Sequence, residues 1–263
     1  MSSPRFPPEL LDHIVDILHN KREALKNCCL VSRSWVPRTR RHLFAHVSFE
    51  TEEVLESWKK TFPDPSTSPA PYTNKLSINC LNDLTTMGAE PGDWINGFSN
   101  IVDLEAVNRG TRRNEAAASL VPLHGLSPIV KSLRVDFIIL PSTQVFDLVL
   151  SFPLLEDLTV VTSSDVSVWR NDQSDVLPAV VLPSNLPVFT GSLELSRAGT
   201  KPFARRLLSL PGGIHFRRLS LTQFYDEDIS LATQLVEECS HTLESLDVTC
   251  SLYSASTCCL RPH

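Results

Sequence analysis

Leucines recur along most of this chain at nearly constant intervals, and each opens a short Leu-x-apolar alternation. The distance from one such leucine to the next is 28, 29, 25, 35, 26 and 27 residues. An alternation of this kind places one face of a short strand inward. A repeated interval indicates units that bury their apolar faces against their neighbours. The leucines that open the seven predicted strands are Leu76, Leu104, Leu133, Leu158, Leu193, Leu219 and Leu246.

Helical periodicity appears between several of these strands. The clearest stretches run over residues 142–151 and 226–239, and Asp226 or Asp228 is predicted to cap the second. Strand followed by helix, repeated, predicts an α/β solenoid over residues 73–263. An ordinary α/β domain with irregular strands is the alternative. The side chains expected to face inward are Val145, Leu148 and Val149 in the first helix, and Ile229, Leu231, Leu235 and Val236 in the second.

Three segments depart from the repeat. Residues 62–71 contain four prolines and are predicted to be a linker or extended surface loop, within a connecting segment over residues 49–72. The longest interval holds residues 163–187, which we interpret either as a binding loop or as a disordered insertion. Residues 251–263 contain no convincing capping helix, so we expect either a truncated chain or an irregular tail.

The first 48 residues have the pattern of three short helices. Pro8 suits the first position of the first helix, because the N–H that proline lacks would have no partner there. The second and third helices are predicted over residues 23–31 and 34–43, with Ser32 or Ser34 capping the third. A module this small buries too little apolar surface to form a stable core alone, so we expect it to pack against something else. The first helix has an apolar stripe of Leu10, Leu11, Ile14, Val15, Ile17 and Leu18, and the second is expected to place Leu25, Cys28, Cys29 and Leu30 inward.

Two motifs in this head match a family pattern. Residues 6–10 read Phe-Pro-Pro-Glu-Leu and residues 31–35 read Val-Ser-Arg-Ser-Trp. Together they resemble an F-box over residues 4–48, with Phe6 in place of the usual leucine. The resemblance implies docking to the Skp-type adaptor of a cullin-RING ubiquitin ligase. The implied adaptor-binding residues, or their immediate support, are Phe6, Pro7, Leu11, Ile14, Leu25, Cys29, Leu30 and Trp35; alternatively, these residues only pack the three helices together.

The body resembles the degenerate leucine-rich repeats that follow many F-boxes and are common in fungi. It lacks their regular asparagine ladder, since only Cys80, Asn108 and Cys250 occupy the corresponding position. The expected architecture is a three-helix F-box-like module (residues 1–48) followed by a short, irregular leucine-rich-repeat solenoid. The implied function is recognition of an unknown protein target for ubiquitin transfer by other subunits. A ligase-independent interaction scaffold is the main alternative, and an enzyme with a site assembled from scattered residues is a weaker one.

Charge and hydropathy narrow the classes of partner. The formal net charge of −6 argues against a general nucleic-acid binder. No segment approaches the roughly 18 apolar residues of a membrane span, so we expect a cytoplasmic and/or nuclear protein without membrane partners. Through Glu50 there are eight Lys and Arg against five Asp and Glu, which makes the head +3 and the rest −9. Arg38, Arg40 and Arg41 are therefore candidates to face an acidic adaptor, although solvated charges would look the same.

The sequence contains none of the common catalytic or nucleotide-binding motifs that we searched for. We find no G-x-S-x-G, P-loop, G-x-G-x-x-G or H-E-x-x-H pattern. The seven cysteines include no CxxC pair, and we interpret them as reduced structural thiols. We therefore expect no catalytic residues, no metal site and no cofactor.

Overall fold

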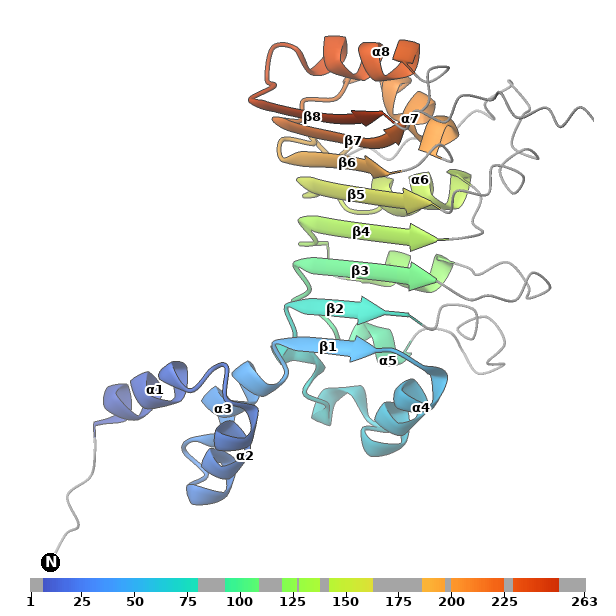
Figure 1. Ribbon diagram of the computed structural model, residues 1–263. Helices are drawn as coiled ribbons and strands as arrows, with labels where there is room; N and C mark the ends of the chain where they lie inside the picture. The colour runs from blue at the N-terminus through green and yellow to red at the C-terminus, as the bar shows by residue number, and fades with distance from the viewer. Residues whose placement is uncertain are drawn as a thin grey trace, which may run out of the picture.

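The computed structural model describes residues 7–79, 93–108, 120–126, 128–137, 142–162, 186–196, 200–224 and 229–250. These residues form an α/β fold around a parallel sheet of eight strands, and each strand lies beside the strands before and after it in the sequence (Figure 1). The strands are β1 (His46–Phe49), β2 (Lys75–Ile78), β3 (Asp103–Asn108), β4 (Ser132–Phe137), β5 (Asp157–Thr162), β6 (Ser192–Ser196), β7 (Arg218–Phe224) and β8 (Ser245–Cys250).

The described residues also form eight α-helices. Helices α1 to α3 lie beyond the β1 end of the sheet, whereas α6 and α7 lie behind it in Figure 1. Three 3₁₀ turns, η1 (Pro65–Thr67), η2 (Ala70–Tyr72) and η4 (Val121–Gly125), connect other elements. The α-helices are α1 (Pro8–Ile17), α2 (Arg22–Val31), α3 (Val36–Leu43), α4 (Glu52–Thr61), α5 (Asp93–Asn96), α6 (Ser142–Leu150), α7 (Lys201–Leu208) and α8 (Ile229–Cys239).

The predicted strand leucines lie opposite one another across the whole sheet. Leu76 pairs with Leu104, and the same register continues through every predicted leucine to Leu246. All of them are buried except Leu246, which lies on the last strand of the sheet. The seven strands predicted from the leucine spacing are therefore confirmed. Strand β1 was not predicted, because it presents Val47 and Phe49 to the core without a leucine.

An aromatic cluster fills the β1 end of the core. Phe49 packs edge-on against Trp58 of α4, Trp94 of α5 and Phe98. Helix α4 was also not predicted, and its Leu55 is fully buried. These contacts anchor β1 and α4 to the sheet, since pairs of aromatic rings add packing energy beyond the area that they bury.

The proline-rich segment 62–71 is more compact than an extended loop. It contains η1 and the first two residues of η2, and both Ser68 and Ala70 are buried. The segment is therefore not extended, but it connects α4 to β2 and forms neither an α-helix nor a strand, as expected. Proline suits the first position of a 3₁₀ turn because its φ angle is already fixed near the required value.

Two predicted helices of the body are present. In α6, Val145, Leu148 and Val149 are buried, as expected. In α8, Leu231 and Leu235 are buried, whereas Ile229 is exposed because it opens the helix; its inward placement was wrong. The proposed caps Asp226 and Asp228, residues 251–263 and nearly all of the 163–187 loop lie outside the described residues.

Candidate partner-binding surface

An ion pair links helix α3 of the N-terminal head to helix α1. Arg38 donates from Nε and from Nη2 to the two oxygens of Asp16, the first contact being 2.7 Å long. His42, one turn further along α3, places Nε2 2.7 Å from the same carboxylate. The hydrogen bonds from Arg38, and then those from His42, hold the pKa of Asp16 well below its usual range. This bidentate geometry fixes the rotation of α1 about its own axis.

The interior of the head is thin. Its buried side chains are Val15 on α1, Leu25 and Cys28 on α2, and Thr39 on α3. Thr39 donates its hydroxyl to the Trp35 carbonyl, 2.7 Å away. Neither Ser32 nor Ser34 caps α3, whose N-cap is Trp35, so that prediction is wrong. Instead, the Ser32 hydroxyl accepts from the Ser34 backbone N–H in the turn before the helix.

Most apolar side chains of the head remain open to solvent. On α1 the exposed fractions are 51% for Leu10, 39% for Ile14 and 63% for Ile17; on α2 they are 85% for Leu30 and 68% for Val31. The three α1 residues share one face, because they are spaced i, i+4 and i+7. We call these five residues the apolar head set. Exposed apolar residues that share a face, as the three on α1 do, mark interaction sites more often than ordinary surface.

The residues implied by the F-box resemblance differ in their access to a partner. Pro7, Ile14 and Leu30 are exposed, and Leu11, Cys29 and Trp35 are half-buried. Leu25 is buried and can only support the surface, while Phe6 lies outside the described residues. Leu30 was expected to face inward but is exposed. The prediction failed because helical periodicity reveals an apolar face without revealing what covers it.

Three members of the apolar head set were missing from the expected site. Leu10 and Ile17 carry a signal that would have found them, since they continue the helical stripe through Ile14. Val31 carries no such signal, because it ends α2 where the periodicity stops.

The sheet supplies a second surface, on the face opposite the leucines. Side chains alternate along each strand, so residues such as Glu105, Arg134 and Glu194 point away from the core. Arg134 Nε lies 3.6 Å from Glu105 Oε1 within this row. In Figure 1 no described helix covers the face toward the viewer. The result is an open polar face along the sheet.

Comparisons with known proteins do not assign the chain to a family. No model of a known protein family matches it, and a search of curated proteins finds no significant similarity. Among the described residues, no three His, Cys, Asp or Glu side chains gather as possible metal ligands. Within the same residues, no helix combines the length and apolar character needed to cross a membrane.

Proposed function

We propose that this chain is a substrate-recognition subunit of a Skp-cullin-F-box type ubiquitin ligase. The observation that carries the proposal is the apolar head set, which the leucine-bearing sheet leaves uncovered. Burying a fully exposed side chain of this kind gains about 1.5 to 3 kcal/mol. Each member of the set would gain the share that corresponds to its exposed fraction. Helices α1 to α3 act as an F-box-like module that binds the Skp-type adaptor, and through it a cullin.

Strands β2 to β8 and their helices act as a leucine-rich-repeat solenoid that binds the target. The continuous leucine register supports this assignment, because repeat units of this class align one strand per unit. The open polar face carries more acidic than basic side chains, including Asp103 and Glu105 on β3, Glu194 on β6 and Asp247 on β8. We expect it to favour a target with a basic surface.

The mechanism would be proximity. The head fixes the chain on the ligase while the sheet holds the target, so the effective concentration of target near the ubiquitin-carrying subunit rises. No side chain of this protein makes or breaks a bond in this scheme. We place the activity in the cytoplasm and/or nucleus, where such ligases work.

The deciding experiment measures binding of the purified full chain to a purified Skp-type adaptor by isothermal titration calorimetry. Leu10→Asp and Leu30→Asp should each weaken binding at least about tenfold, because a buried charge without a partner costs more than about 1.4 kcal/mol. Leu154→Asp is the matched control, since Leu154 is 51% exposed, like Leu10, but lies in the body. It should bind as the wild type does.

Failure of the wild-type chain to bind the adaptor would remove the ligase assignment. If another protein then required Leu10 and Leu30 for binding, the chain would act as a ligase-independent scaffold. Equal loss of adaptor binding in Leu10→Asp and Leu154→Asp would show that the head is not the docking surface.

A further inference from the structure

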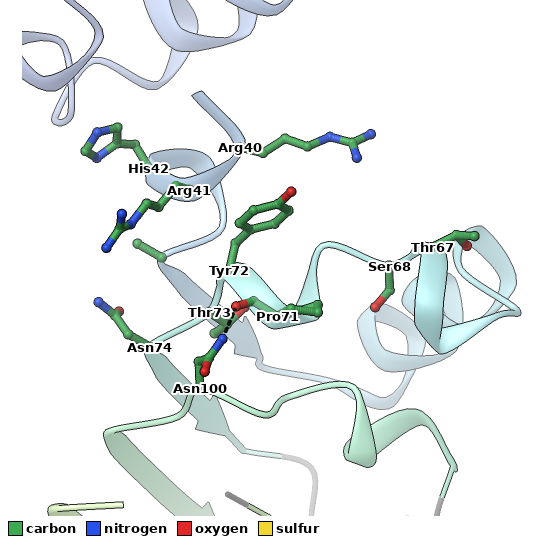
Figure 2. Close-up of a pocket in the computed structure, with 11 residues that line it drawn as sticks. Arg40, Arg41, His42, Thr67, Ser68, Pro71, Tyr72, Thr73, Asn74 and Asn100 are labelled. Atoms are coloured by element: carbon green, nitrogen blue, oxygen red, sulfur yellow. Dashed lines mark hydrogen bonds between the residues drawn. The ribbon is translucent and has the colours of Figure 1, made fainter. Parts of the chain in front are cut away.

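A large cleft lies between the end of α3 and the turn that leads into β2 (Figure 2). Its volume is about 1110 Å³, slightly above the usual range for small-molecule sites. Helix α3 provides Arg40 and Arg41, while η2 and the following residues provide Tyr72, Thr73 and Asn74. In Figure 2 the Tyr72 ring lies below Arg40, whereas Arg41 extends on the other side of the ring, above Asn74.

The charge of this cleft is positive in a chain whose formal net charge is negative. None of the described residues that line it is an Asp or a Glu. His42 also lines the cleft, but its Nε2 is engaged by Asp16 on the other side of α3. Arg40 and Arg41 are exposed and form no ion pair with any described residue. Two guanidinium groups are therefore available for an anion.

Thr73 provides an independent indication of a ligand site. Its side chain is fully buried, it lines the cleft, and its Oγ1 finds no hydrogen-bond partner within the described part of the chain. A buried hydroxyl without a partner is destabilising, and native structures keep few of them. The nearby Asn100 is already engaged, because its Nδ2 donates to the Pro71 carbonyl at 2.7 Å. A ligand oxygen that came within hydrogen-bond distance of Oγ1 would satisfy this buried hydroxyl.

We propose that this cleft binds a phosphate monoester. A dianionic phosphate offers three terminal oxygens, and arginine recognises phosphate through paired, charge-assisted hydrogen bonds. Arg40 and Arg41 line the cleft on opposite sides of Tyr72, so either guanidinium can give a bound phosphate its paired hydrogen bonds while the other adds positive charge. The volume leaves room for the group that carries the phosphate. This inference goes beyond the proposed function, because the cleft includes no member of the apolar head set. Arg40 also lies on the side of α3 opposite to Arg38.

The test is a titration of the full chain with O-phosphoserine, with inorganic phosphate, and with one serine peptide in phosphorylated and unphosphorylated forms. Arg40→Gln combined with Arg41→Gln should weaken phosphoserine binding at least tenfold. Arg22→Gln combined with Arg205→Gln is the matched control, because both side chains are exposed outside the cleft. The control loses the same two charges and should bind within about twofold of the wild type.

Thr73→Val separates the role of the hydroxyl from that of charge. Valine preserves the shape, so in phosphate-free buffer its melting temperature should equal or exceed that of the wild type, while phosphoserine binding weakens severalfold. A melting temperature several degrees lower would show that Oγ1 already has a partner, and would overturn the inference.

The ligands distinguish the source of the phosphate. Tighter binding of the phosphopeptide than of phosphoserine supports a phosphorylated polypeptide, and equal binding supports a small phosphate ester. No binding of any phosphorylated probe by the wild type would overturn the inference. So would equal losses in the two double variants, because they would indicate attraction by net charge alone. Adaptor binding is measured with a different ligand, so either proposal can fail without the other.

Discussion

Arg38 donates hydrogen bonds from two nitrogens to the Asp16 carboxylate, and this contact determines which side of α1 faces solvent. Asp16 and the neighbouring Val15 turn toward the rest of the head, which leaves Leu10 and Ile14 on the outside. The pair therefore acts as a positioning contact for the proposed adaptor surface. Because both side chains are partly exposed, it contributes orientation more than stability.

The Asp16 contact predicts a local pH dependence. Its pKa is lowered in the folded chain, so the stabilisation is present above the ordinary carboxyl pKa of about 4 and is lost as the pH falls below it. The protection factors of the α1 amides, measured relative to the intrinsic exchange rate at each pH, should fall on acidification through this range. Asp16→Asn should show fast α1 exchange already at neutral pH. Unchanged α1 exchange in this variant would show that the ion pair does not hold the helix.

Substitutions of two leucines in α2 should have separate effects on the stability of the head and on adaptor binding. Leu25→Ala removes a buried side chain and should cost about 2 to 5 kcal/mol of local stability. Leu30→Ala removes an exposed one and should change stability by less than about 0.5 kcal/mol, yet it should weaken adaptor binding. Thermal unfolding and calorimetry of the two variants provide the comparison, and a large stability loss in Leu30→Ala would contradict it.

The β1 end of the sheet should depend strongly on Phe49. Phe49→Ala leaves a cavity among Trp58, Trp94 and Phe98 and should destabilise the protein by about 3 to 5 kcal/mol. Equilibrium urea unfolding followed by tryptophan fluorescence measures this change. Glu50→Ala, at the exposed next position, is the control and should have almost no effect. Similar midpoints for both variants would argue against the aromatic cluster as an anchor.

Gly191 should not tolerate a side chain. A Cβ at this position would lie 2.5 Å from Asp157 Oδ1 and 2.8 Å from the Glu156 carbonyl oxygen. The same Asp157 oxygen accepts from the Ser192 backbone N–H at 2.7 Å, so it is not free to move. We expect Gly191→Ala to cost about 1 to 3 kcal/mol, measured by urea unfolding. Gly212→Ala, which meets open space, should be neutral by comparison.

The sequence predicted the sheet better than it predicted the surfaces. Leucine spacing located seven strands, because the same residue type recurs at the same register of the buried row in each of them. Strand β1 was missed because Val47 and Phe49 present the same apolar face without a leucine. The apolar stripe of α1 was visible, but its exposure was not, since that depends on Arg38 reaching Asp16 across 22 positions of sequence. The orphan hydroxyl of Thr73 depends in the same way on three-dimensional neighbours.

Leu158 and Leu193 lie opposite each other in β5 and β6, although 35 residues separate them. The other neighbouring leucines of the row are 25 to 29 residues apart and reach the same alignment. The pairing of β5 with β6 therefore does not require a connection of the usual length. This makes the connection between β5 and β6 the natural insertion point for engineering. A foreign peptide inserted into this connection would be displayed on the protein, while β5 and β6 remained paired with their neighbouring strands.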